Sequence, residues 1–395
     1  MYIGIHVNTL PTTVFINRLL EALVKRGHKV VVFGTAIDSF KKIKGVSYAH
    51  YVLHSFFNSS KVVQFLKYSI LLSFFKRKQK TALDKFLIAK GIYNIHQKTQ
   101  FYPMLWHQPD ILHVQWVKGI EQFLWVKKFD IKLATSLRGS HIYLTPLIDK
   151  EVANSYCKSL PQLDGIHSVC QDLINTAIDY SLLTDRSTVI YSGLEIADFP
   201  FIKPSKKQSI NEGCLNIISV GRASWMKKFD VALDAMQILN THGVKFKYTI
   251  VGVKNSEELT FQIHDLNLQN QVELFEWQPF ERVKKHIQSA DVLLISSVSE
   301  GIANAAIEAM ALGTIVLSTD CGGMKELVED GINGMITPMR NPREIAKSIN
   351  LFNELTIQDK DSLAKNARKK VEAEFDMSKN IGAFEHFYEN CLQEW

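Results

Sequence analysis

Two glutamates, Glu300 and Glu308, lie with seven residues between them around a glycine turn in the second half of the chain. The apolar run 291–296 before the turn predicts a buried parallel strand. The alanine-rich run 303–312 after the turn predicts a helix. The turn is therefore expected at the carboxyl end of a strand, where doubly wound sheets bind their ligands.

The start of the predicted helix has the features of an anion site. The backbone N–H groups of Ile302, Ala303 and Asn304 would have no partner inside the helix, and the helix dipole adds partial positive charge. Together with Gly301 in the turn, these groups predict a site that phosphate would occupy most naturally.

Both carboxylates fit such a site. Glu308 falls one helical turn after Asn304 on the same face of an otherwise apolar helix, where it could accept two hydrogen bonds from a vicinal diol such as a ribose. Glu300 in the turn would face whatever lies beyond the phosphate. The structural alternative is that Glu308 caps a neighbouring backbone and Glu300 is a solvated turn residue.

Two cations follow a second predicted strand, 215–220. Arg222 comes directly after Gly221, and Lys228 lies six residues later, where a helix is expected to begin. An arginine fork and a lysine point charge at this spacing can converge on a diphosphate. For a solitary lysine, the alternative would be a solvated helix start.

These segments resemble the retaining GT-B glycosyltransferases of family four. The run EGIANAAIEAMALG resembles the donor-site motif of that family, and STDCGGMKELVEDGINGMITP resembles its GG-x-x-E-L and D-G-x-N-G segments. The run GRASWMKKFDVALDAMQIL resembles its G-R-x-x-x-x-K-G-x-x-x-x-L segment, with Phe229 taken as the counterpart of the glycine. The resemblance covers most of the second half and, more loosely, the first half.

The first half departs from the family at one turn. PDILHVQW resembles the family's P-D-I-I-H-x-H-W, and DIKLATSLRGSHI resembles its strand that ends in H-G-x-D. The family histidine, which is usually placed against the transferred sugar, is Arg138 here, and the aspartate is His141. Arg138 could bind a phosphate or carboxylate bidentately, or it could hold the turn.

Length and composition predict two globular domains. A chain of 395 residues is too long for one core, and its hydrophobic and charged contents of 46% and 22% are those of a globular protein. We expect an α/β protein with a first domain at 1–200, a linker at about 199–212 and a second domain at 213–375. The apolar stripe in 376–395 predicts a helix, and the resemblance implies that it packs back on the first domain.

Several protein classes are disfavoured by the sequence. Five scattered cysteines without a C-x-x-C pair argue against a disulfide framework and a zinc site, and favour a reducing cytoplasm. The strand 2–7 and the following loop carry neither G-x-G-x-x-G nor G-K-[ST], so a dehydrogenase or P-loop enzyme is not expected. The chain begins without a basic, signal-like segment, and the apolar run 68–75 is too short to span a bilayer.

The segment 61–98 is strongly basic. Nine lysines and arginines face a single acid, Asp84, whereas the whole chain has a net charge of only +6. Phenylalanines and leucines lie between the charges, which is typical of basic amphipathic helices on an anionic membrane surface. Core-facing helices with solvated lysines are the alternative. No nucleic-acid-binding module is apparent in the sequence, and none is predicted.

The resemblance implies two Rossmann-like domains facing a cleft and transfer of a sugar from a nucleotide-diphospho-sugar to a glycan or lipid-linked acceptor, with retained configuration. The implied setting is polysaccharide or cell-envelope synthesis in the cytoplasm, either free or attached peripherally to the cytoplasmic membrane face. Arg222, Lys228 and the helix start would hold the diphosphate without a metal or other cofactor, Glu308 the ribose, and Glu300 the transferred sugar.

Other hypotheses stay open. Glu300 could act as a covalent nucleophile instead of a sugar-binding group. The chain could be a nucleotide-sugar epimerase or a phosphorylase of the same fold. It could also be a non-catalytic partner that binds the nucleotide-sugar, since the turn at 138–141 is altered.

Overall fold

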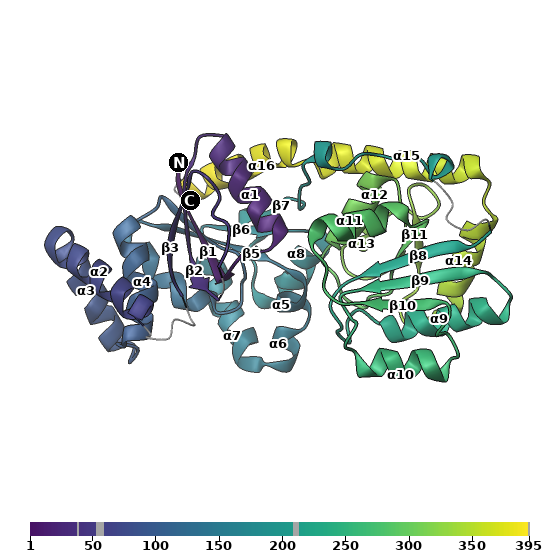
Figure 1. Ribbon diagram of the computed structural model, residues 1–395. Coiled ribbons are helices and arrows are strands. Elements are labelled where there is room, and N and C mark those ends of the chain that lie inside the picture. Colours follow the sequence, from purple (N-terminus) through teal and green to yellow (C-terminus); the bar gives the residue numbers. More distant parts are fainter. Residues whose placement is uncertain (38, 53–58, 208–212, 394–395) are drawn as a thin grey trace. The chain divides into compact units, whose positions relative to one another are not determined.

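The chain folds into two compact units (Figure 1). The computed structural model describes residues 1–37, 39–52, 59–207 and 213–393. Unit 1 comprises Met1–Val169, Ile174–Gly193 and Met377–Trp395, and unit 2 comprises Cys170–Leu173 and Leu194–Asp376. The boundary at Gly193 lies a few residues before the expected end at 200. Most of the predicted linker belongs to unit 2, and its residues 208–212 lie outside the described residues.

Unit 1 is built on a seven-stranded parallel sheet with the order β3-β2-β1-β4-β5-β6-β7. Its strands are β1 (Tyr2–Leu10), β2 (Lys29–Ala36), β3 (Val46–Val52), β4 (Ile111–Val114), β5 (Lys132–Leu137), β6 (Gly165–Ser168) and β7 (Ser187–Val189). Its helices are α1 (Val14–Lys25), α2 (Ser59–Phe75), α3 (Arg77–Ala89), α4 (Ile95–His107), η1 (Ile120–Phe129), α5 (Gly139–Tyr143), α6 (Thr145–Ile148), α7 (Lys150–Ser159), η2 (Leu160–Gln162), η3 (Ile178–Tyr180), η4 (Thr184–Arg186) and α16 (Met377–Leu392). Helix α8 (Gln171–Ala177) begins in unit 2 and ends in unit 1.

The last helix, α16, returns to unit 1 and covers its sheet beside α1 (Figure 1). A stripe at helical spacing, Ile381, Phe384, Phe387 and Tyr388, joins the core that β1, β2 and α1 form. Packing removes these apolar side chains from water, and such burial of an apolar face is the main source of helix stability in proteins.

A buried chain of hydrogen bonds fixes α16 to the sheet. The hydroxyl of Tyr388 lies 2.9 Å from Nδ1 of His113, whose Nε2 lies 2.8 Å from Oγ of Ser136. Oγ of Ser136 in turn lies 2.8 Å from Nδ1 of His167, and Nε2 of His167 lies 2.9 Å from the carbonyl oxygen of Ile190. Since a carbonyl only accepts, His167 donates at its far end, and every bond is satisfied with both imidazoles neutral.

Unit 2 has a six-stranded parallel sheet with the order β10-β9-β8-β11-β12-β13. Its strands are β8 (Leu215–Val220), β9 (Phe246–Val251), β10 (Val272–Phe275), β11 (Val292–Ile295), β12 (Ile315–Thr319) and β13 (Met335–Thr337). Its helices are η5 (Ile196–Asp198), η6 (Pro204–Lys206), α9 (Phe229–Thr241), α10 (Glu257–Asp265), α11 (Phe280–Ser289), α12 (Asn304–Leu312), α13 (Met324–Leu327), α14 (Pro342–Glu354) and α15 (Ile357–Glu374).

The strands at the centre of unit 2 are covered on both faces, as their apolar runs predict. All four residues of β11 and all five of β12 are buried. Between them, α12 ends at Gly313, whose φ of 87° is the left-handed conformation expected of a C-terminal glycine. The two parallel, doubly wound sheets confirm the predicted fold class.

Candidate functional site

The candidate site of unit 2 lies where the strand order changes direction. From β8 the chain proceeds to β9 on one side, while β11 pairs with β8 on the other. The loops after β8 and β11, 221–228 and 296–303, therefore leave neighbouring strands at the same edge. This is the topological switch point at which open α/β sheets bind ligands.

An ion pair joins these two loops. Oε1 of Glu300 accepts hydrogen bonds from Nζ of Lys227 at 2.5 Å and from Oγ of Ser297 at 2.8 Å. The lysine and glutamate side chains are 25% and 15% exposed, so both charged heads are partly removed from water and still reachable by a ligand. Because an ammonium group has three donors, Lys227 keeps donors for another anion.

Backbone contacts hold the pair in place. The N–H of Val298 donates to the carbonyl oxygen of Met226 at 2.8 Å, and Oγ of Ser296 donates to that of Lys227 at 2.7 Å. Both bonds connect the loop after β11 with the loop after β8. The position of Lys227 is therefore fixed by its main chain as well as by Glu300.

The structure brings Lys227 to Glu300, and it does not bring Lys228 there. Lys228 is the residue before α9, has a left-handed φ of 49°, and directs its Nζ to Asp230 at 3.3 Å. Counted from Arg222, the pattern G-R-x-x-x-x-K-G places its lysine at 227 and its glycine at 228. The sequence-based prediction therefore placed the lysine of this pattern one residue too late. The left-handed φ of Lys228 agrees with the corrected alignment, because glycine readily adopts that conformation.

Arg222 lies exposed at the beginning of the same loop. No carboxylate among the described residues lies within ion-pair distance of its guanidinium. The structure therefore places Arg222 on the loop that carries Lys227 without bringing it into the pair with Glu300.

The free N–H groups at the start of α12 differ from those that the sequence predicted. The N–H of Ala303 points at Sδ of Met324, 3.4 Å away. The N–H groups of Ile302, Asn304 and Ala305 have no acceptor among the described residues, and the buried Oδ1 of Asn304 also lacks a donor there. The groups free to bind an anion are therefore the N–H groups of Ile302, Asn304 and Ala305, so Ala305 joins the predicted set and Ala303 leaves it.

The turn around Gly301 is crowded by a glycine from the next loop. A Cβ placed on Gly323 would lie 2.4 Å from the carbonyl oxygen of Gly301, and the N–H of Gly323 donates to the carbonyl oxygen of Glu300 at 3.4 Å. Only a residue without a side chain fits there, so the C-G-G segment after β12 supports the Glu-Gly turn.

Glu308 is the charged residue within α12, and it is only 8% exposed. It lies one turn after Asn304, and its neighbours Ala306, Ile307 and Ala309 are fully buried. A carboxylate so deep in an apolar helix is one that binds a partner rather than one that is merely solvated.

Unit 1 carries a different cation at the equivalent edge of its sheet. Arg138 follows β5, and its Nε and Nη2 donate to the carbonyl oxygen and the side-chain oxygen of Gln115 at 3.0 and 2.8 Å. Its guanidinium carbon lies 4.2 Å from the centre of the Phe15 ring. Burial lowers the pKa of Arg138 to about 9, so the group is still charged at neutral pH.

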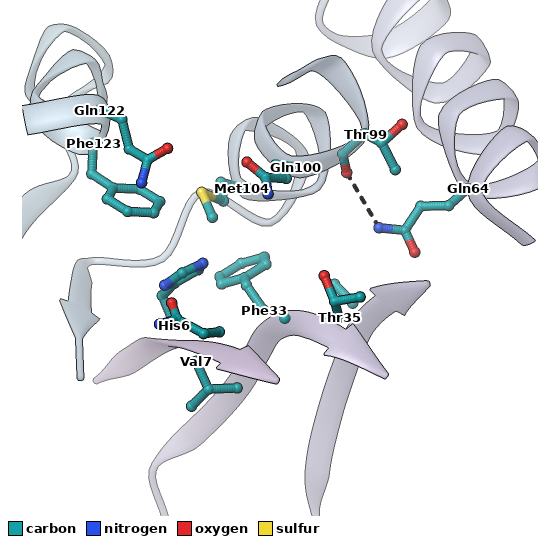
Figure 2. Close-up of a pocket in the computed structure, with 13 residues that line it drawn as sticks. His6, Val7, Phe33, Thr35, Gln64, Thr99, Gln100, Met104, Gln122 and Phe123 are labelled. Atoms are coloured by element: carbon teal, nitrogen blue, oxygen red, sulfur yellow. Dashed lines mark hydrogen bonds between the residues drawn. The ribbon is translucent and has the colours of Figure 1, made fainter. Parts of the chain in front are cut away.

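Unit 1 also contains a cavity of about 200 Å³ (Figure 2). It lies at β1, β2 and β3 beside α4, and polar side chains such as His6, Thr35, Gln64 and Gln100 line it together with Phe33. Its lining has no charged side chain, and burial lowers the pKa of His6 to about 4. Such a lining suits neutral hydroxyl groups or water rather than phosphate.

Comparison with known proteins shows which fold and which family this chain resembles. The fold is that of GT-B glycosyltransferases: the Anabaena protein HepE, solved in complex with UDP and glucose, superposes with a TM-score of 0.72 at 17% identity, covering 98% of this chain and 99% of that chain. At this identity the likeness shows the fold alone. Residues 201–370 match the model of the family "Glycosyl transferases group 1".

Curated relatives agree with that match. WcaL of Escherichia coli strain K12, a glycosyltransferase assigned to colanic acid biosynthesis, is 37% identical over 169 residues, which are 41% of this chain and 42% of WcaL. The amylovoran biosynthesis glycosyltransferase AmsK of Erwinia amylovora is 35% identical over 169 residues, 41% of each chain. The alignments span about two fifths of these relatives. Over this segment the chain is similar to the group 1 glycosyl transferases.

Proposed function

We propose that this protein transfers a sugar from a nucleotide-diphospho-sugar to a hydroxyl group of a glycan or lipid-linked acceptor in polysaccharide or cell-envelope synthesis. The observation that carries the proposal is the pair of Lys227 and Glu300 at the switch point of unit 2, beside the unpartnered N–H groups of α12. The bound UDP and glucose of HepE, and the polysaccharides in the names of WcaL and AmsK, support it.

The diphosphate would lie at the start of α12. The N–H groups of Ile302, Asn304 and Ala305 donate to its oxygens, and Arg222 and Lys227 neutralise its charge. Lys227 takes the role that the sequence spacing gave to Lys228. Glu308 accepts hydrogen bonds from the ribose, and Glu300 binds the transferred sugar while it holds Lys227 in position.

The configuration of the sugar would be retained by attack on one face. The acceptor oxygen bonds to the anomeric carbon on the side from which the diphosphate leaves, and the bond to the diphosphate oxygen breaks. That oxygen takes the proton of the acceptor hydroxyl, and the nearby cations stabilise the charge that develops. The step needs no metal ion, because Arg222, Lys227 and the helix dipole supply the positive charge.

Calorimetry and product analysis test this proposal. UDP, UDP-glucose, ADP-glucose and GDP-mannose are titrated into the full chain. The nucleotide-sugar that binds is then incubated with the protein and a set of acceptors. We expect one nucleotide-sugar to bind and to react, with the same rate in EDTA and with the anomeric configuration kept in the NMR spectrum of an early product. An inverted product contradicts the retaining mechanism, binding without transfer favours a non-catalytic partner, and conversion without an acceptor favours an epimerase.

We also propose that α2 and α3 bind the cytoplasmic face of an anionic membrane. Helix α2 buries Tyr68 and Leu72, whereas its outward apolar residues include Phe74 and Phe75, which are 80% and 73% exposed. Arg77 follows directly and is exposed. Aromatic side chains beside cations favour an interfacial helix. Among the described residues, no helix has both the length and the apolar composition needed to span a bilayer.

The membrane proposal needs variants that spare the fold. Nζ of Lys76 donates to the carbonyl oxygens of Leu105 and Trp106, and Lys80 pairs with Asp84, so neither lysine is free for lipid. The test is therefore a chain with Arg77, Lys78, Lys85 and Lys90, all exposed, changed to Gln. It should sediment less with anionic vesicles than the wild type at low salt, and the difference should vanish at high salt. Equal sedimentation would contradict the proposal.

A further inference from the structure

The guanidinium of Arg138 has fewer partners than its environment demands. It has five N–H donors, and the described structure supplies acceptors for two of them, both on Gln115. No carboxylate of the described residues lies within ion-pair distance of it. A partly buried cation without a counter-ion is a high-energy arrangement, because the lost hydration is replaced only by two neutral acceptors and the face of the Phe15 ring.

The groups around Arg138 would repel another cation. Burial and the charges of Lys118 and Arg138 lower the pKa of His141. Arg138 also contributes to the lowered pKa of His113 and of His167 behind it. At the turn where the resembled family has histidine and aspartate, this chain has Arg138 and His141, so the carboxylate that could neutralise a cation is missing. The local field therefore favours an anion.

An unsatisfied donor lies beside the guanidinium. Gln115 is fully buried, and its Nε2 has no acceptor. Its orientation is fixed, because Oε1 must face Nη2 of Arg138, which can only donate. Nδ1 of His141 is likewise buried without a partner. An oxyanion that accepts from Arg138 and from Nε2 of Gln115 would satisfy both groups.

We propose that Arg138 and Gln115, with Lys118 at the rim, bind an oxyanion carried by the acceptor, either a carboxylate or a phosphate. The assignment of this anion to the acceptor rests on the proposed function, whereas the anion site itself rests on the structure of unit 1 alone. The site is separate from the neutral cavity, because none of Arg138, Gln115 and Lys118 is among the residues that line that cavity.

The first experiment measures anion binding. UDP is kept saturating so that phosphate cannot bind unit 2, and inorganic phosphate, D-glucuronate and D-glucose are titrated at constant ionic strength. We expect the wild type to bind phosphate or glucuronate and not glucose, and Arg138→Gln to bind at least tenfold more weakly. Lys150→Gln, which removes an exposed lysine at the start of α7, should bind as the wild type does. Equal binding by Arg138→Gln, or no binding by the wild type, overturns the proposal.

A second variant guards against a loss of folding. Gln115→Glu keeps the shape of the side chain and gives Arg138 an internal carboxylate in place of the amide. It should melt at a higher temperature than the wild type and yet lose anion binding at least tenfold. Anion binding at wild-type strength in this variant overturns the proposal.

Transfer assays distinguish the two sources of the anion. Phenyl glucuronide, glucose 1-phosphate and phenyl glucoside are compared as acceptors, with the donor that calorimetry identifies. We expect one charged acceptor to be preferred, with a KM that rises tenfold or more in both variants. The glucuronide identifies a carboxylate and the phosphate ester identifies a phosphate, whereas preference for the neutral glucoside overturns the assignment to the acceptor. Binding of UDP in the same samples tests the proposed function separately.

Discussion

The two sheets each place a cation after a central strand, but they neutralise it differently. In unit 2, Lys227 is paired with Glu300, a carboxylate from the neighbouring loop. In unit 1, the described residues give Arg138 the neutral oxygens of Gln115 and the ring of Phe15, and no carboxylate. A paired cation is held in place whether or not a ligand is bound. An unpaired one gains a counter-ion only when an anionic ligand binds, so ligand binding should raise the stability of unit 1.

Breaking the pair of unit 2 should have the largest effect. Lys227→Met removes a proposed diphosphate contact and leaves Glu300 as a partly buried charge without its cation. A charge-assisted contact to the diphosphate contributes up to about 3 kcal/mol, so we expect donor turnover to fall roughly a hundredfold. The measurement is kcat/KM for the donor, with the melting temperature as a check of folding.

Lys254→Met is the matched control, because Lys254 is an exposed lysine of the same unit. It should keep wild-type turnover. Glu300→Gln keeps an acceptor for Ser297 and should lower kcat rather than the affinity for UDP. Wild-type turnover in Lys227→Met would remove the pair from the proposed site.

The second-largest expected difference between the two units is the loss of stability of unit 1 at low pH. In unit 1, burial lowers the pKa of His6 to about 4 and of His167 to about 3, and holds that of His113 well below its usual value. The unfolded state then binds more protons than the folded state below about pH 6.5. Stability is therefore complete above that pH and is lost as the pH falls toward the folded values, by about 2 kcal/mol at pH 5 for each of His6 and His167.

Unit 2 should not lose stability in this way, because its three histidines are exposed or partly exposed: His242, His264 and His286. Hydrogen exchange followed by mass spectrometry at pH 7, 6 and 5, corrected for intrinsic rates, reports the units separately. Protection should be lost first in β4, β6 and α16. Simultaneous loss in both units would contradict the assignment of acid sensitivity to the buried histidines.

Arg222 is the third test, since it is a cation of unit 2 that has no carboxylate partner among the described residues. Arg222→Ala should weaken binding of UDP by a charge-assisted contact of about 1.5–3 kcal/mol, roughly tenfold to a hundredfold. Because the side chain is exposed, the melting temperature should stay the same. Calorimetry with UDP measures the effect, and unchanged affinity would exclude Arg222 from the diphosphate site.

The sequence predicted the strands and the turn that carries Glu300, because these features depend on the pattern of residues along the chain. Apolar runs such as 291–296 placed the strands, and the turn after them placed Glu300 at a ligand-binding edge. What it missed depends on geometry across the chain. The contact of the Ala303 N–H with Met324 joins residues 21 positions apart, and the choice between Lys227 and Lys228 depends on a backbone angle. The field around Arg138 likewise needs β4 and α1 to be placed beside β5 before it can be recognised.

The smallest expected effect concerns Lys228, the neighbour that the spacing had selected. A left-handed φ of 49° costs a residue with a side chain about 1–2 kcal/mol, which glycine avoids. Glycine would lose the half-exposed contact with Asp230, worth about 0.2–1 kcal/mol, and would make the unfolded chain more flexible by about 0.4–1 kcal/mol. The free energy of unfolding of Lys228→Gly should therefore lie within about 1 kcal/mol of the wild type. Lys228→Val, which adds a branched side chain at this φ, should be the less stable variant.

Donor turnover of Lys228→Gly should stay within about threefold of the wild type, because no described contact joins Lys228 to Glu300. Denaturant unfolding and donor kinetics on the two variants decide the point. A loss of turnover as large as that of Lys227→Met would return the diphosphate contact to Lys228.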